Sequence, residues 1–183
     1  MEREGHPYYA GLLSAAQFHG VAHHRPQEFQ VVVARPRRPI VCGQVRVSFF
    51  VRKNIAAIPA QSFNTPRGTI RVSTPEATTF DLIGYADQVG GLDQVATVLA
   101  ELGEALDPDK LAAAADASPV AWAQRLGYLL ASTDYEDKTG PLLAFVGRKA
   151  RQTAPLLVGA PLDDAPRDAA WKLTVNADVE PDL

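Results

Sequence analysis

The sequence predicts an α+β fold, with a mostly antiparallel sheet of about four or more short strands packed on helices and a smaller helical lobe after it. Two observations support this prediction. Stretches rich in β-branched and aromatic residues are concentrated between residues 28 and 73, and apolar residues recur at helical spacing after residue 74. A length of 183 residues is enough for a hydrophobic core that needs no disulfide.

The first predicted element is a helix over residues 8–20, in the stretch "YYAGLLSAAQFHG". Its core-facing positions share helical spacing, which places them near one stripe. They are Tyr9, Leu12, Leu13, Ala16 and Gln17. Gly20 suits the end of this helix, because glycine readily adopts the left-handed conformation found there.

The sheet is predicted from four stretches that follow. "EFQVVVA" (28–34) and "QVRVSFFV" (44–51) have the composition of strands, and "AQSFN" and "GTIRVS" indicate two shorter ones joined by a turn at "TPRG". The intervening "RPRRPIVCG" contains prolines and a glycine, which predict a connection rather than a strand. Short links between successive strands favour antiparallel pairing.

A helix over residues 75–86 is predicted in "STPEATTFDLIGYA". Thr74 can cap it, Pro75 suits its first position, and an acid at Glu76 complements the helix dipole. Capping does not explain Asp81, which stands between Phe80 and Leu82. This aspartate either lies at the surface or ties down a neighbouring loop.

The remaining helices follow the same signals. "LDQVATVLAELGEAL" predicts a helix over residues 91–105, and Asp107-Pro108 and Ser118-Pro119 each predict a capped helix start. "PLLAFVGRKA" predicts one more short helix, and "APLLVG" and "AWKLTVNADV" resemble strands. We therefore expect a core domain over 1–106, and over 107–183 a helical lobe whose last strands pack back on the core.

Composition excludes several classes of protein. The hydrophobic fraction of 46% and the charged fraction of 21% are those of a globular chain, and a net charge of −3 is not typical of a nucleic-acid-binding protein as a whole. The single cysteine, Cys42, excludes an internal disulfide and a cysteine cage for a metal. No signal-peptide core or membrane-length apolar run is present in the sequence, so we expect a cytoplasmic protein without a membrane partner.

A basic cluster is the best candidate for a contact surface. It consists of Arg35, Arg37, Arg38, Arg46, Arg52 and Lys53. One interpretation is a solvated loop that also protects a sheet edge from unwanted pairing. The other is a surface that binds phosphates or an acidic partner, because arginine pairs well with both. The sequence leaves both interpretations open.

Other candidate sites are weaker. His19 and His23 have the spacing of a metal pair, with His24 and Glu28 nearby, but Gly20 interrupts the helix and no zinc-protease glutamate follows His19. Phosphate-binding glycine loops, nucleophile elbows and nuclease-type acid clusters are missing from the sequence. Cys42, beside Val41, suits inert packing. We therefore predict no catalytic, cofactor-binding or metal-binding residue and no enzyme activity.

Several motifs occur together in an order that resembles a known family. They are "YYAGLLSAAQFHG", "EFQVVV", "STPEAT" with Asp81, "GGLDQVATVLAEL" and the ending "WKLTVNADVEPDL". Together they resemble the AbiEi antitoxins of type IV toxin–antitoxin (abortive infection) systems of bacteria. That family joins an N-terminal winged-helix DNA-binding domain to a larger C-terminal domain. The chain resembles the C-terminal domain, and we expect the winged-helix domain to be absent from it.

The resemblance implies a function. A domain of this kind acts as an antitoxin and transcriptional regulator, counteracts a nucleotidyltransferase-like toxin and supports repression of its own operon at operator DNA. Two alternatives stay open: a stand-alone ligand-binding or homo-oligomerisation domain of a transcriptional regulator, and a catalytically inactive nuclease-like domain.

Overall fold

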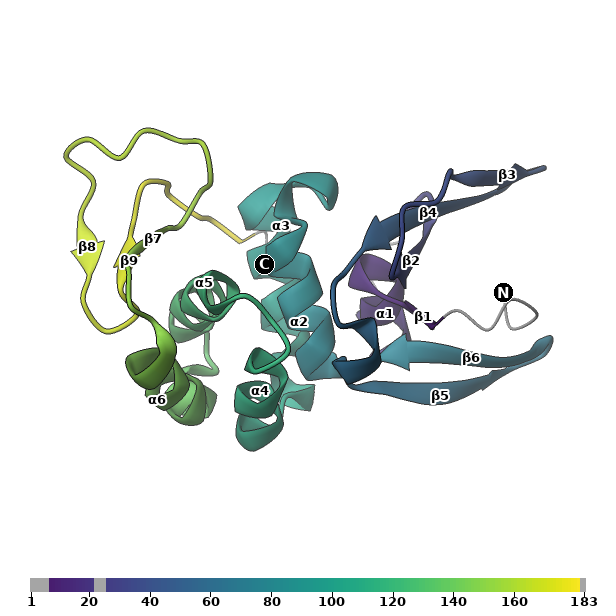
Figure 1. Ribbon diagram of the computed structural model, residues 1–183, viewed down its shortest axis with the longest axis horizontal. Helices are drawn as coiled ribbons and strands as arrows, with labels where there is room; N and C mark the ends of the chain where they lie inside the picture. The colour runs from purple at the N-terminus through teal and green to yellow at the C-terminus, as the bar shows by residue number, and fades with distance from the viewer. Residues whose placement is uncertain (1–6, 22–25, 182–183) are drawn as a thin grey trace.

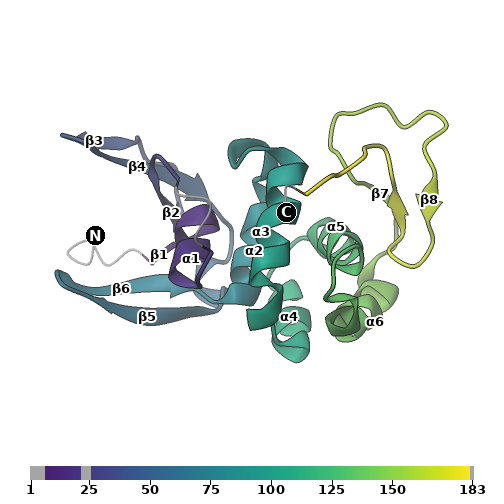
Figure 2. The same cartoon turned by 180° about the vertical axis from the view of Figure 1, so that it is seen from behind.

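The computed structural model describes residues 7–21 and 26–181 and confirms an α+β fold. A six-stranded sheet with two long hairpins lies at one end of the molecule, the helices α2 to α6 occupy the middle, and a small three-stranded sheet lies at the other end (Figure 1). Seen from behind, the two hairpins diverge from each other as they leave the helices (Figure 2). No helix of the described residues is long and apolar enough to cross a membrane.

The large sheet is mixed, with strand order β3-β4-β2-β1-β6-β5. Its strands are β1 (Tyr8–Ala10), β2 (Phe29–Val33), β3 (Ile40–Cys42), β4 (Val45–Val51), β5 (Ala60–Thr65) and β6 (Gly68–Ser73). β1 pairs antiparallel with β2 but parallel with β6, and β2 pairs parallel with β4. The β3–β4 and β5–β6 hairpins supply the other antiparallel pairs.

The prediction for "RPRRPIVCG" was wrong over its last part. Ile40–Cys42 forms β3, which pairs antiparallel with β4. The link from β2 to β4 is therefore not a tight turn. It carries the chain back along the sheet, so that β4 runs parallel to β2, whereas tight turns would have given antiparallel neighbours.

The N-terminal helix begins later than predicted. Tyr8–Ala10 is the strand β1, and α1 covers Leu12–Phe18. β1 becomes a central strand because β2 and β6 pair with it on either side. Gly11 separates strand from helix, and a Cβ atom there would lie 2.6 Å from a methyl group of Val32. Only glycine allows this close approach to β2.

Five helices and four short 3-10 turns follow β4. They are η2 (Ile55–Ala57), α2 (Pro75–Gly84), η3 (Ala86–Gln88), α3 (Gly91–Leu102), η4 (Gly103–Ala105), α4 (Pro108–Ala115), α5 (Val120–Ala131), η5 (Glu136–Thr139) and α6 (Gly140–Lys149). Two predicted caps are confirmed, since the side chain of Thr74 accepts from Ala77 N and that of Asp107 from the first amides of α4. Ser118 is not a cap, because Pro119 occupies the N-cap position of α5 and no side chain caps the start of this helix.

The C-terminal strands pack back on the helices. They are β7 (Ala154–Pro155), β8 (Arg167–Asp168) and β9 (Leu173–Thr174). The amide of Gln124 on α5 donates to the carbonyl oxygens of Gln152 and Lys172, which fixes both outer segments to that helix. Buried residues from Tyr9 to Leu173 form one main hydrophobic cluster, which crosses the predicted boundary at 106–107. The division into two domains stays a prediction.

Candidate functional site

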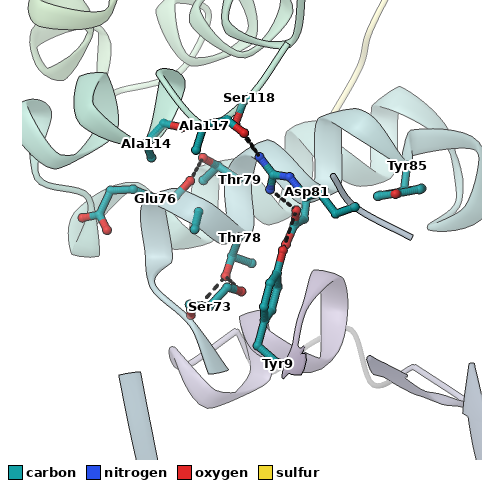
Figure 3. A network of polar contacts seen from close by, with 12 residues as sticks. Tyr9, Ser73, Glu76, Thr78, Thr79, Asp81, Tyr85, Ala114, Ala117 and Ser118 are labelled. Carbon is teal, nitrogen blue, oxygen red and sulfur yellow. Dashed lines mark hydrogen bonds and ion pairs between the residues drawn. The ribbon is translucent and has the colours of Figure 1, made fainter. Parts of the chain in front are cut away.

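A buried charge pair joins the sheet to the helices. Arg52, directly after β4, is 4% exposed and Asp81 on α2 is 0% exposed. The guanidinium of Arg52 donates to Oδ1 of Asp81, and the hydroxyl of Tyr9 on β1 donates to the same oxygen at 3.3 Å (Figure 3). Asp81 therefore accepts hydrogen bonds from β1 and from the residue that follows β4. It ties down the chain after β4, which is one of the two roles predicted for it.

The same arginine reaches the turn between α4 and α5. Its other terminal nitrogen donates to Oγ of Ser118 and to the carbonyl oxygen of Ala117, the latter at 3.4 Å. The ring of Trp122 lies over the guanidinium, 5.1 Å from its centre. Gly84 makes room for this ring, because a Cβ atom there would lie 2.2 Å from it. Arg52 thus connects β4, α2 and α5.

Burial dominates the electrostatics of this network. It raises the pKa of Asp81 to about 6, although the neighbouring Arg52 and the hydroxyl of Tyr9 both act to lower it. Burial, and then the charge of Asp81, raise the pKa of Tyr9. Oδ2 of Asp81 and Nε of Arg52 are buried without a hydrogen-bond partner among the described residues. At neutral pH the pair is ionised and holds three elements together.

A cavity of about 460 Å³ lies beside the network. Among the residues that line it are Arg52, Lys53, Tyr85, Ser118 and Trp122. The hydroxyl of Tyr85 donates to the carbonyl oxygen of Val51, so its polar tip is already engaged. Asp81 neutralises Arg52, and Asp116, which also lines the cavity, lies 3.7 Å from the ammonium of Lys149.

One residue of the predicted basic cluster, Arg52, is buried, and the other five are exposed. Arg35, Arg37 and Arg38 are exposed on the segment between β2 and β3. Arg46 on β4 is exposed and lies 3.9 Å from the carboxylate of Glu28. Lys53 is also exposed, whereas Arg52 is buried against Asp81 and does not lie on that surface. The sequence does not reveal this difference, because the partner of Arg52 is 29 positions away.

Charge is strongly segregated along the chain. Residues 29–75 contain eight basic residues and no acidic one, and all 21 acidic residues lie outside this segment. Two exposed arginines of the β5–β6 hairpin, Arg67 and Arg71, belong to it and were missing from the predicted cluster. The long interval without an acidic residue is the sequence signal that would have added Arg67 and Arg71 to the predicted basic cluster. The large sheet, with its hairpins, is thus the basic part of the molecule.

The β3–β4 hairpin also exposes apolar side chains. Ile40 is 49% exposed, Val41 67% and Val45 61%. Cys42 is exposed as well, so the prediction that it packs inertly is wrong. The hairpin extends beyond β2, and no layer of the described structure covers its tip (Figure 1).

His19 makes a structural contact. Its Nε2 donates to the carbonyl oxygen of Ser73 at 2.7 Å, and its ring meets that of Phe63 edge-on. Burial lowers its pKa. Within residues 7–21 and 26–181, no group of three or more His, Cys, Asp or Glu side chains could hold a metal ion. His23 and His24 lie outside the described residues.

Comparison with a solved structure identifies a similar fold. The crystal structure of RV2827C protein from Mycobacterium tuberculosis matches with a TM-score of 0.62 at 14% sequence identity. The match covers 91% of this chain and 61% of that chain, so the chain spans less than two thirds of its length. At this identity the match concerns the fold alone. No individual curated protein sequence matches the chain.

Comparison with protein families gives a match over most of the chain. The family model described as "AbiEi antitoxin C-terminal domain" covers residues 9–132. This range begins in β1, includes all three residues of the Tyr9–Arg52–Asp81 network, and ends just after α5. The chain belongs to the AbiEi antitoxin family.

Proposed function

We propose that this protein is the antitoxin and transcriptional-regulator module of a bacterial type IV toxin–antitoxin system. In this role it counteracts a nucleotidyltransferase-like toxin in the cytoplasm and supports repression of its own operon. It acts by binding and not by catalysis. Membership of the AbiEi antitoxin family is the observation that carries the proposal.

The charge distribution supports a binding role for the large sheet. Arg35, Arg37, Arg38, Arg46 and Lys53 are exposed in the segment that contains no acidic residue. Arginine pairs bidentately with phosphate and carboxylate groups, so this surface suits operator DNA or an acidic partner. We propose that these five residues contribute contacts. Arg52 has a positioning role, because it holds the end of β4 against α2.

A charge-reversal variant tests the proposal. Arg35→Glu, Arg37→Glu and Arg38→Glu are introduced together, and the variant is co-expressed with a nucleotidyltransferase-like toxin of this class of system. We expect loss of growth rescue, loss of operator repression, or both. In operator DNA binding, each lost phosphate contact should lower the salt dependence of log K by about one unit.

The matched control reverses three exposed cations on the helical part, Lys110, Arg148 and Arg151. It changes the net charge equally but should preserve rescue and repression. If both triple variants fold and both retain full activity, the arginines after β2 are only a solvated loop. If wild-type protein neither rescues growth nor represses the operon, the antitoxin function itself is wrong.

A further inference from the structure

The outer edge of β3 is open to strand addition. β3 is the last strand of the six-stranded sheet and, among the described residues, pairs only with β4. Cys42 and Val45 flank a two-residue turn and so form the hydrogen-bonded pair that closes the hairpin. The next pair, Val41 and Arg46, is then non-hydrogen-bonded, which turns the N–H and C=O of Val41 outward.

The two faces of this hairpin differ in chemistry. Cross-strand neighbours share a face, so Ile40, Cys42 and Val45 lie on one side and Val41 and Arg46 on the other. The first face is apolar and exposed. The second face carries the guanidinium of Arg46, which is 62% exposed.

Edge protection accounts for only part of this arrangement. β3 is three residues long and Pro39 precedes it, and both features limit pairing, but the strand itself consists of Ile40, Val41 and Cys42 and carries no charge. The positive charges lie around the strand, with Arg38 before it and Arg46 across from it. An open apolar strand beside cations fits an extended partner that carries negative charge.

We propose that the β3 edge binds an extended acidic polypeptide segment, which adds to the sheet as a further strand. Side chains of an added strand alternate between the two faces. Apolar residues of the segment then lie beside Ile40 and Cys42, and its acidic residues lie on the face of Arg46. This inference rests on the open edge and goes beyond the antitoxin function, which does not require it.

A labelled peptide that alternates glutamate and valine is the probe. Its binding is measured by fluorescence anisotropy to wild type and to two proline variants. Val41→Pro removes the outward N–H without breaking a bond to β4, and Val41 is exposed, so the fold is retained. Ser62→Pro is the matched control, because β5 is the opposite edge and the pairing of Ser62 with Arg71 leaves its N–H outward by the same alternation.

We expect the wild type and Ser62→Pro to bind the peptide equally and Val41→Pro to bind at least about fivefold more weakly, as loss of one backbone hydrogen bond predicts. A peptide with lysine in place of glutamate should not bind. The amide of Val41 should exchange with deuterium more slowly in the complex.

Equal binding by both proline variants, equal binding of the two peptides, or no binding to wild type would overturn the proposal. Displacement of the peptide by duplex DNA, with DNA binding unaffected by Val41→Pro, would assign the surface to phosphate recognition instead. Failure of peptide binding while the Arg35, Arg37 and Arg38 reversal still abolishes growth rescue would reject the strand-addition site and leave the antitoxin function standing.

Discussion

Replacing Arg52 by methionine tests whether the buried pair holds the sheet to the helices. The substitution keeps much of the aliphatic stem but removes the charge beside Asp81, which is fully buried. It also removes the bond to Ser118 and the contact with Trp122. Leaving one member of a buried ion pair without its partner costs about 3–5 kcal/mol. This is a large part of the roughly 5–15 kcal/mol that stabilises a domain.

Compensating substitutions sharpen this prediction. Arg52→Met with Asp81→Leu removes both charges but leaves the hydroxyl of Tyr9 without its acceptor, which costs about 1–3 kcal/mol. Adding Tyr9→Phe removes that hydroxyl, so the triple variant should approach wild-type stability. Ser118 also donates to the carbonyl oxygen of Ala114, so we expect it to keep this partner in every variant.

Urea unfolding at pH 7, followed by circular dichroism, gives the free energy of unfolding of each variant. The expected order of stability is wild type close to the triple variant, then the double variant, then Arg52→Met. A loss below about 1 kcal/mol in Arg52→Met, or a triple variant as unstable as the single one, would refute the reasoning, because a buried unpaired carboxylate must cost more than this.

Three further predictions concern stability. Gly127→Ala should lower the free energy of unfolding by about 1–3 kcal/mol, because its new Cβ would lie 1.9 Å from the ring of Trp171. Gly140→Ala places its Cβ in open space, so thermal unfolding should show it to be neutral or stabilising. Because burial raises the pKa of Asp81 to about 6, the folded protein keeps a proton that the unfolded chain releases above about pH 4, so the stability that this proton adds falls as the pH rises from about 4 through 6. The free energy of unfolding of wild type relative to Asp81→Asn should therefore fall across this window in a urea series. Lys138→Met should lower the melting temperature, because its ammonium donates to three carbonyl groups after α3 at 2.8–2.9 Å.

Each of these predictions has a contrary outcome. Equal stability of Gly127→Ala and Gly140→Ala would show that the ring of Trp171 can move away at no cost. A constant difference between wild type and Asp81→Asn from pH 4 to pH 7 would mean that the carboxyl titrates as it does in the unfolded chain. An unchanged melting temperature in Lys138→Met would mean that water replaces the ammonium at all three carbonyl groups.

Local features of this protein were determined by the sequence itself. Thr74 and Asp107 were identified as helix caps because a cap bonds to amides only two or three positions ahead. The α+β class followed from the change from β-branched stretches to helical spacing. The order of the motifs was enough to indicate the AbiEi family.

Only the tertiary structure decided the features that depend on distant partners. Tyr8–Ala10 became a strand because β2 and β6 lie on either side of it, although its residues also fit a helix. The sequence groups Arg52 with its exposed neighbours. It is nevertheless buried, because its guanidinium pairs with the carboxylate of Asp81 on α2. The exposure of Val41 depends on where β3 falls in the strand order. Pairing and burial are set by contacts far apart in the chain, and one sequence read locally does not contain their positions.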